Sequence, residues 1–259
     1  MQDELKIAAI QVDLFWENKE KNLRLFEHRI LQLDADTDLI ILPEMFSTGF
    51  TMQPSAVAET MQGATVQWML AIAESTNVGM VGSLVIKENN QYYNRVVFVK
   101  PNRDINTYDK RHLFSLAGED KVYTSGENRL ITLFKGWKIC PLICYDLRFP
   151  VWSRNCNDYD LLLYVANWPI PRISSWDALL KVRAIENMSY CVGLNRVGED
   201  ANGYLYNGHT KVYDCVGKEI ASTTEGDEEI LQCILSKSLQ EKTRKKFNFL
   251  NDRDLFTIN

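Results

Sequence analysis

The sequence predicts an α/β fold built from layered sheets. Short, fully apolar runs such as 39–42 and 161–166 recur along the chain, and such runs are typical of strands covered on both faces. Helical patterns lie between these runs, and no segment rich in Gly, Pro or Ser divides the chain. We therefore expect one layered domain that spans residues 1–259.

Composition excludes several classes of protein. Hydrophobic residues make up 46% of the 259 residues, which is enough to bury a sizeable core. The formal net charge of -5 argues against nucleic acid as a partner. The basic run from Lys242 to Lys246 is expected to be a solvated helix face.

Cofactors and membranes are also not expected. The six cysteines and three histidines lack metal-ligand spacing, and no glycine-rich phosphate-binding motif is present. The start of the sequence does not resemble a cleavable leader, and no apolar segment is long enough to cross a bilayer. A reducing cytoplasm is the expected location, with the cysteines as free thiols.

The first half of the chain alternates strand and helix patterns. Asn18 is a good N-cap, and apolar residues recur at helical spacing from there to about Leu33, which predicts a helix. A second helix is predicted at 64–76, and Asn89-Asn90 is typical of a hairpin turn. Strands are predicted at 6–12, 39–42, 78–86, 92–100 and 105–108.

The second half repeats this alternation. Pro150 is suited to the first turn of a helix that reaches Asn155, and Ser174 is the expected cap of a helix that ends near Asn187. Val216-Gly217 is the expected turn between two short strands, and 248–259 fits no pattern. Strands are predicted at 130–134, 137–143, 161–166, 190–195, 211–214, 219–221 and 229–235.

Cys144 lies where the apolar run 137–143 stops abruptly before charged and aromatic residues. A sharp turn between a strand and a helix exposes a side chain, and its free N–H groups favour a thiolate and a developing oxyanion. Cys144 is therefore a candidate nucleophile. The alternative is a small buried hydrophobic residue, which is a common role for a lone cysteine.

Glu44 and Lys110 follow two other predicted strands. A carboxylate in Glu44's position suits proton transfer, although it could instead cap backbone amides. Lys110 could be an ordinary surface charge. Because ligands collect at the carboxyl ends of strands in layered α/β folds, these side chains and Cys144 could converge on one crevice. A base, a cation and a thiol together supply the groups needed to cleave an amide.

Three segments in this order carry a resemblance to a known family. They read L-P-E-M-F-S-T-G-F (42–50), Y-D-K-R-H-L-F (108–114) and I-C-Y-D-L-R-F-P-V-W-S-R-N (143–155). The chain resembles the nitrilase, or carbon-nitrogen hydrolase, superfamily over essentially its whole length, including Y-V-A-N-W-P and R-A-I-E-N. It is most similar to the bacterial omega-amidases, also called 2-oxoglutaramate amidases. The resemblance implies a four-layer α-β-β-α sandwich that forms a homodimer by packing sandwich on sandwich.

The resemblance also implies roles for particular residues. Cys144 would be the nucleophile, Glu44 the general base, and Lys110 the oxyanion stabiliser, helped by the backbone N–H of Tyr145. Glu119 would position the substrate and the lysine. The sequence has Ser175 where relatives commonly have histidine, which we expect to alter the pocket and not the chemistry.

The implied substrate is the terminal amide of a short 2-oxo dicarboxylate monoamide, such as 2-oxoglutaramate or 2-oxosuccinamate, cleaved through a Cys thioester without a cofactor. Arg172 is the candidate clamp for the distal carboxylate, although it could be a solvent-facing arginine. The aromatic residues expected to form the pocket walls are Phe46, Phe50, Phe114 and Trp168, although all four could instead belong to the core, Phe50 in particular.

Other functions fit the same residues. Within the superfamily they are a nitrilase, an N-carbamoyl amino-acid or polyamine hydrolase, or a broader aliphatic amidase. A non-catalytic binding protein on this fold is a more distant alternative. A redox-sensing thiol protein is another, although only Cys140 lies near Cys144 in the sequence.

Overall fold

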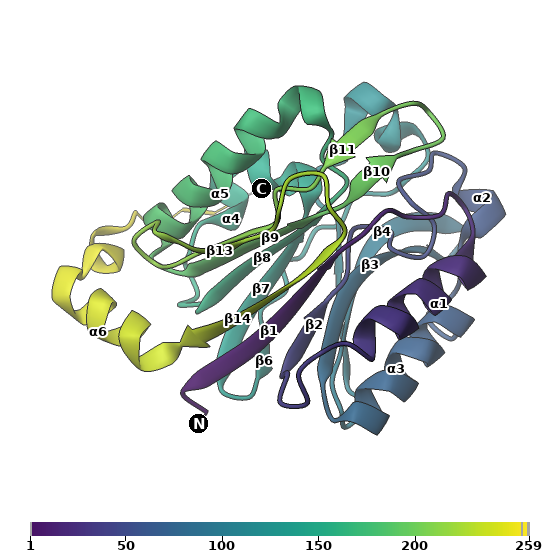
Figure 1. Ribbon diagram of the computed structural model, residues 1–259. Helices are drawn as coiled ribbons and strands as arrows, with labels where there is room; N and C mark the ends of the chain where they lie inside the picture. Colours follow the sequence, from purple (N-terminus) through teal and green to yellow (C-terminus); the bar gives the residue numbers. More distant parts are fainter. Residues whose placement is uncertain (1, 255, 258–259) are drawn as a thin grey trace.

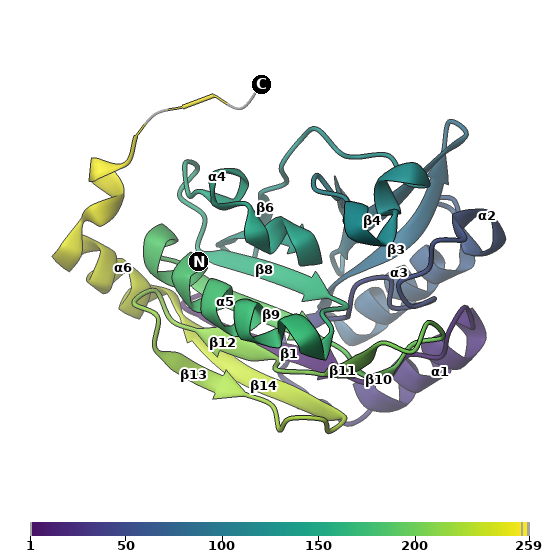
Figure 2. The same ribbon diagram turned by 90° about the horizontal axis from the view of Figure 1, so that it is seen from above.

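The computed structural model describes residues 2–254, 256 and 257, and it consists of two six-stranded sheets packed face to face (Figure 1). The first sheet has the order β14-β1-β2-β3-β4-β5, and the second has the order β13-β12-β9-β8-β7-β6. Helices α1 and α3 cover the outer face of the first sheet, and α5 runs along the outer face of the second (Figure 2). The predicted α-β-β-α sandwich is confirmed.

Helices separate several of the strands, whereas β3 to β7 and β9 to β14 follow one another without an α-helix between them. The first half contains β1 (Glu4–Gln11), α1 (Lys19–Ile30), β2 (Leu39–Ile41), α2 (Pro54–Val57), α3 (Ala64–Thr76), β3 (Gly79–Glu88), β4 (Gln91–Val99) and β5 (Ile105–Asp109). The second half contains β6 (Thr132–Phe134), β7 (Trp137–Ile143), α4 (Pro150–Ser153), β8 (Leu161–Ala166), α5 (Ile173–Asn187), β9 (Tyr190–Asn195), β10 (Val197–Glu199), β11 (Leu205–Asn207), β12 (Lys211–Tyr213), β13 (Glu219–Ser222), β14 (Glu229–Ser236) and α6 (Lys237–Phe247).

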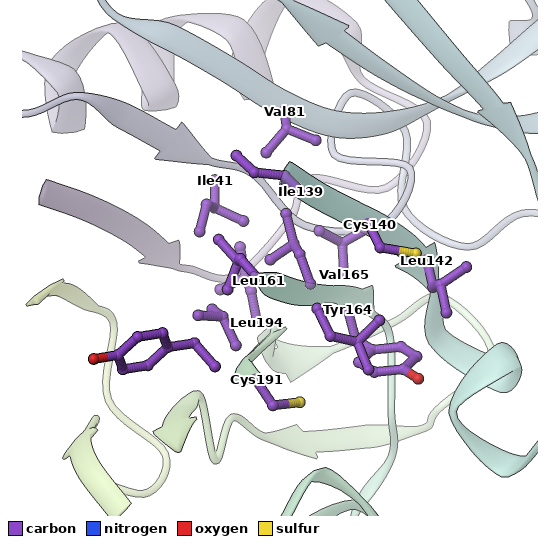
Figure 3. Packing of buried hydrophobic residues seen from close by; sticks show 14 of the residues in the cluster. Ile41, Val81, Ile139, Cys140, Leu142, Leu161, Tyr164, Val165, Cys191 and Leu194 are labelled. Carbon is purple, nitrogen blue, oxygen red and sulfur yellow. The ribbon is translucent and has the colours of Figure 1, made fainter. Parts of the chain in front are cut away.

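The fully apolar strands are explained by two hydrophobic layers. In β2, Leu39 and Ile41 face the second sheet, whereas Ile40 packs in the layer beneath α1 and α3. Because neighbouring side chains of a strand point to opposite faces, a strand covered on both sides must be apolar at every position. Figure 3 shows Ile41 and Val81 of the first sheet meeting residues of the second across the central layer.

Most predicted elements lie where the sequence placed them. The helix at 64–76 and the strands at 137–143, 161–166 and 190–195 have the predicted bounds. The Asn18 side chain accepts a hydrogen bond from the N–H of Lys21 and so caps α1. Asn89 and Asn90 both have positive φ, as a tight hairpin turn between β3 and β4 requires.

Several predictions differ in detail from the structure. Helix α1 ends at Ile30, before the predicted Leu33. Ser174 lies inside α5 and not at its cap, because a 3₁₀ helix at Ile170–Arg172 runs directly into the α-helix. Helix α2 and the short hairpin of β10 and β11 were not predicted, and of α6 only the basic run from Lys242 to Lys246 was predicted to be helical.

The C-terminal region is partly described. Lys242, Lys245 and Lys246 lie exposed on α6, as predicted for the basic run. A 3₁₀ helix follows at Phe249–Asp252, in the segment that fits no sequence pattern. None of the helices in the described part of the chain has the length and apolar character needed to cross a membrane.

The directions of the strands determine where the functional residues meet. Strands β1, β2 and β3 are parallel, and β5 runs in the same direction because two antiparallel pairings separate it from β3. In the other sheet, β7, β8 and β9 are parallel. The carboxyl ends of β2 and β5 therefore share one edge, as do those of β7 and β8. The residues that follow these strands can meet at that end of the sandwich.

Gly193 of β9 allows α5 to lie close against the second sheet. A Cβ atom at this position would lie 2.4 Å from Leu180 and 2.7 Å from Trp176. We expect Gly193→Ala to lower the free energy of unfolding by about 1–3 kcal/mol, because the helix must shift outward. Urea denaturation of Gly193→Ala, Leu180→Ala and the double variant measures this. If the clash is the cause, the double variant loses less stability than the sum of the single variants, and simple additivity would contradict it.

Candidate active site

Glu44 follows β2 and is completely buried. Its Oε1 accepts hydrogen bonds from Lys110 Nζ and Asn94 Nδ2, each at 2.9 Å. Its Oε2 accepts one from the backbone N–H of Asn167 at 2.8 Å and a longer one from Asn167 Nδ2 at 3.3 Å. These four donors hold the carboxylate in one orientation and stabilise its charge away from water.

Lys110 follows β5 and forms a buried ion pair with each of two carboxylates. Its Nζ donates to Glu44 Oε1 at 2.9 Å and to both oxygens of Glu119 at 2.9 and 3.1 Å. Glu119 also accepts hydrogen bonds from the backbone N–H of Phe114 and from Asn94 Nδ2. Asn94 thus contacts both carboxylates, and no member of the group has any exposed surface.

The charges of this group depend on one another. Burial alone would lower the pKa of Lys110, but the charges of Glu119 and Glu44 outweigh burial and raise that pKa. Burial raises the pKa of Glu119, and Glu44 adds to the effect, although Lys110 opposes it. Lys110 is therefore held as a cation. Replacing either carboxylate would leave its positive charge less well balanced in a site without water.

Cys144 sits on a strained turn at the end of β7. Its φ is 42°, in the left-handed region that non-glycine residues seldom adopt. A 3₁₀ helix at Cys144–Arg148 begins at the cysteine itself, and the four-residue α4 follows it. The predicted strand, turn and helix are present, but the first helical turn is of the 3₁₀ type.

Asp146 joins the cysteine turn to the lysine segment. Its Oδ2 accepts hydrogen bonds from the N–H of Ile143 at 3.0 Å and the hydroxyl of Tyr108 at 2.7 Å. Its Oδ1 accepts one from the N–H of His112 at 3.1 Å and lies 2.8 Å from His112 Nδ1. Because Tyr108 and His112 flank Lys110, this one buried carboxylate fixes the cysteine turn relative to the lysine segment.

The charge state of Cys144 differs from the prediction. The sequence analysis expected the turn to favour a thiolate, but burial and the adjacent Glu44 carboxylate raise the pKa of Cys144 well above its usual value. Lys110 opposes this effect, and Glu119 adds to it. Burial and the neighbouring carboxylates together favour the neutral thiol as the resting form of Cys144.

Cys144 lies on a cavity of about 350 Å³ at this end of the sandwich. Glu44, Lys110 and Glu119 are not part of its surface and lie buried behind it. The lining residues are Phe50, Met52, Phe114, Leu116, Ala117, Cys144, Tyr145, Arg148, Asn167, Trp168, Pro169, Arg172, Asp200, Asn202, Tyr204 and Tyr206.

The predicted pocket residues divide into two groups. Tyr145, Phe114, Trp168 and Arg172 line the cavity. Phe46 does not, and its assignment as a wall is corrected. It is fully buried beneath the helices, with its ring 5.4 Å from that of Phe26.

The locations of Phe46 and Phe50 are the reverse of those expected from the sequence. Phe50, for which a core position was considered, lies on the cavity with its ring 5.2 Å from Lys110 Nζ. The two residues lie on one turn after β2, and the sequence gives no sign of which ring points inward.

Several residues of the site were not predicted. Asn94 contacts Glu44 and Glu119 from β4, and its neighbour Arg95 makes it look like part of a polar strand end, so the sequence carries no clear signal for it. Asn167 holds Glu44 from the loop that follows β8. Arg148 lies on the cavity wall, four residues after the cysteine.

The hairpin of β10 and β11 forms one rim of the cavity. Asp200 accepts hydrogen bonds from the hydroxyl of Tyr206 and from the N–H groups of Asn202 and Tyr204. This carboxylate is therefore occupied in shaping the hairpin. Among the described residues, no group of three or more His, Cys, Asp or Glu side chains is arranged to hold a metal ion.

A neutral thiol beside a buried Glu-Lys pair, at the strand ends of this sandwich, defines a thiol-dependent hydrolase site. The family model described as carbon-nitrogen hydrolase matches residues 6–245. The chain belongs to the carbon-nitrogen hydrolase family.

Individual relatives agree with this assignment. The chain is 44% identical over 254 residues to the omega-amidase YafV of Escherichia coli K12, covering 98% of each chain. It is 30% identical to the 2-oxoglutaramate amidase of Bacillus subtilis, covering 83% of this chain and 85% of the relative.

A solved structure is also similar along the whole chain. The protein XC1258 from Xanthomonas campestris, a CN-hydrolase superfamily protein with an arsenic adduct in its active site, superposes with a TM-score of 0.97. The two chains are 35% identical, and the match covers 100% of both.

The raised pKa of Cys144 gives a pH-dependent prediction. Because Glu44 raises this pKa, Glu44→Gln lowers it and increases the thiolate fraction at a given pH below the pKa. We expect the pH midpoint for alkylation of Cys144 by iodoacetamide to lie above 9.0 in the wild type and to move to lower pH in Glu44→Gln. Mass spectrometry of the modified peptide measures the rate. Slower alkylation of Glu44→Gln across the whole pH range would contradict the assignment.

Proposed function

We propose that this protein is an omega-amidase. It hydrolyses the terminal carboxamide of short 2-oxo dicarboxylate monoamides, such as 2-oxoglutaramate and 2-oxosuccinamate, to the acid and ammonia. The observation that carries the proposal is the placement of Cys144 on a cavity that Arg148 and Arg172 also line, with Glu44 and Lys110 close enough to the sulfur to shift its pKa. Similarity to the omega-amidase and 2-oxoglutaramate amidase named above supports the choice of substrate.

Acylation begins with transfer of the Cys144 proton to Glu44. The sulfur attacks the amide carbon, and the carbonyl oxygen becomes an oxyanion that Lys110 and the backbone N–H of Tyr145 stabilise. Glu44 then gives the proton to the nitrogen, the C–N bond breaks, and ammonia leaves. Because the resting thiol is neutral, one proton transfer from Cys144 to Glu44 produces both the thiolate nucleophile and the protonated Glu44 that acts as general acid.

Hydrolysis of the thioester completes the cycle. Glu44 takes a proton from a water molecule, whose oxygen attacks the acyl carbon, and Lys110 and the Tyr145 N–H again stabilise the oxyanion. The C–S bond breaks, the acid is released, and the proton returns to Cys144. Glu119 keeps Lys110 charged and in place through both halves of the reaction.

The anionic end of the substrate binds in the outer part of the cavity. Arg172 supplies the cation, and its guanidinium lies 5.0 Å from the ring of Phe114. Trp168 forms the neighbouring wall. A cavity of about 350 Å³ is suited to a five-carbon monoamide.

We further propose one domain over residues 1–259, acting as a homodimer in a reducing cytoplasm. A core cluster shared by both sheets supports a single domain. Val182 and Ile185 of α5 are 45% and 46% exposed, and such apolar side chains would be buried by a second copy. The six free cysteines are compatible with a reducing compartment.

A panel of substrates tests the proposed function. We expect the wild type to release ammonia from 2-oxoglutaramate and 2-oxosuccinamate with higher kcat/KM than from propionamide, propionitrile or N-carbamoylalanine. Cys144→Ala should remain folded and lose turnover, since the nucleophile is absent. Mass spectrometry of the quenched reaction should show an acyl adduct on Cys144. Turnover by Cys144→Ala, or a preference for a nitrile or a carbamoyl compound, would contradict the proposal.

The role of Arg172 gives a second prediction. Arg172→Ala should raise the KM for 2-oxoglutaramate roughly 10- to 100-fold, because a charged hydrogen bond to the carboxylate is lost, and kcat should change little. Steady-state ammonia release gives both constants. Arg103→Ala, which removes an exposed arginine paired with Glu74, is the control. An unchanged KM in Arg172→Ala would remove the clamp assignment.

A further inference from the structure

Two arginine side chains line the cavity, and they come from two different 3₁₀ helices. Arg148 belongs to the 3₁₀ helix that starts at Cys144, and Arg172 ends the 3₁₀ helix that leads into α5. Within the described part of the chain, neither guanidinium forms an ion pair with a carboxylate. The nearby Asp200 is occupied by Tyr206 and by the backbone of its own hairpin.

Each guanidinium lies against an aromatic ring. The Cζ of Arg148 is 4.9 Å from the centre of the Trp168 ring, and that of Arg172 is 5.0 Å from the centre of the Phe114 ring. Stacking on a ring fixes the plane of a guanidinium and leaves its N–H groups free to bind an anion. The cavity thus offers two oriented cations without a protein anion to neutralise them.

Ser175 connects the two arginines. Its Oγ accepts a hydrogen bond from Arg148 Nη2 at 2.9 Å and donates one to the backbone carbonyl of Arg172 at 2.7 Å. The same carbonyl accepts the indole N–H of Trp168 at 2.8 Å. The carbonyl oxygen of Arg172 therefore accepts hydrogen bonds from two groups that hold Arg148. One is the Ser175 hydroxyl, and the other is the indole N–H of Trp168, on whose ring Arg148 lies.

We propose that Ser175 is a positioning residue for specificity, which orients Arg148 so that Arg148 and Arg172 together bind the carboxylate of the substrate. This inference rests on the proposed omega-amidase function and deepens it. Ser175 does not touch the reacting amide and acts through Arg148. Its contribution therefore falls on the binding of anionic substrates and not on the chemical step.

A local role for Ser175 explains only part of its geometry. A serine in the first turn of a helix often bonds to a backbone carbonyl nearby, as Ser175 does with Arg172. That role does not require the contact with Arg148 Nη2, which comes from a residue 27 positions earlier in the chain. A purely local role would affect the stability of α5 and leave substrate preference unchanged.

Kinetics with paired substrates distinguish the two roles. Ser175→Ala, Ser175→Thr and the control Ser174→Ala, which changes an exposed serine on the same helix, are compared with the wild type. Each is assayed with the anionic 2-oxoglutaramate and the neutral pentanamide. We expect Ser175→Ala to raise the KM for 2-oxoglutaramate about fivefold to tenfold, with kcat and the constants for pentanamide unchanged. Ser175→Thr keeps the hydroxyl and should restore the wild-type KM, and Ser174→Ala should have no effect.

The contrary results are equally specific. The inference fails if Ser175→Ala leaves the KM for 2-oxoglutaramate unchanged, or if it changes the constants for both substrates in the same proportion. It also fails if Ser175→Thr behaves like Ser175→Ala.

A binding experiment separates failure of this inference from failure of the proposed function. If the wild type does not release ammonia from 2-oxoglutaramate, the omega-amidase proposal fails. Calorimetric titration of 2-oxoglutaramate into Cys144→Ala and Cys144→Ala/Ser175→Ala then measures the anion site without turnover. A Kd about fivefold to tenfold weaker in the double variant supports the role of Ser175, and equal Kd values or no binding to either protein would contradict it.

Discussion

A single buried ammonium held between two carboxylates is the interaction on which the rest of the site depends. Lys110 pairs with Glu44 and Glu119 where none of the three is exposed, so each charge is tolerated only because the others are present. Burial and the adjacent Glu44 carboxylate raise the pKa of Cys144, which favours the protonated thiol at rest. In the proposed reaction, the thiol proton passes through Glu44 to the leaving ammonia.

The fold supplies this arrangement by bringing strand ends of two sheets together. Glu44 and Lys110 come from the first sheet, whereas Cys144 and Asn167 come from the second. Hydrogen bonds cross between the sheets, from Asn167 to Glu44 and from Tyr108 to Asp146. These hydrogen bonds hold Glu44 and the cysteine turn in place, while much of the cavity lining comes from side chains of loops and short helices. This division suits a constant chemical step combined with an adjustable choice of substrate.

Much of the fold could be predicted because local pattern and tertiary structure agree. Strands such as 161–166 are apolar at every position because they are covered on both faces, and Asn89-Asn90 adopts the backbone conformation that its residues favour. The position of Ser174 was not predictable from capping preference, since the preceding 3₁₀ helix extends α5. The charge state of Cys144 was also missed, because it depends on carboxylates that are remote in sequence. Phe46 and Phe50 show the same limit, since the direction of each ring is set by packing and not by residue type.

The central claim is that Cys144 is a neutral thiol at neutral pH before a substrate binds. The most direct measurement is the infrared S–H stretching band of Cys144, taken as the difference between the wild type and Cys144→Ala at neutral pH without substrate. The account predicts that the band is present, and that it weakens as the pH rises above the usual range for a cysteine thiol. A difference spectrum with no S–H band at neutral pH would show a preformed thiolate and would contradict the account.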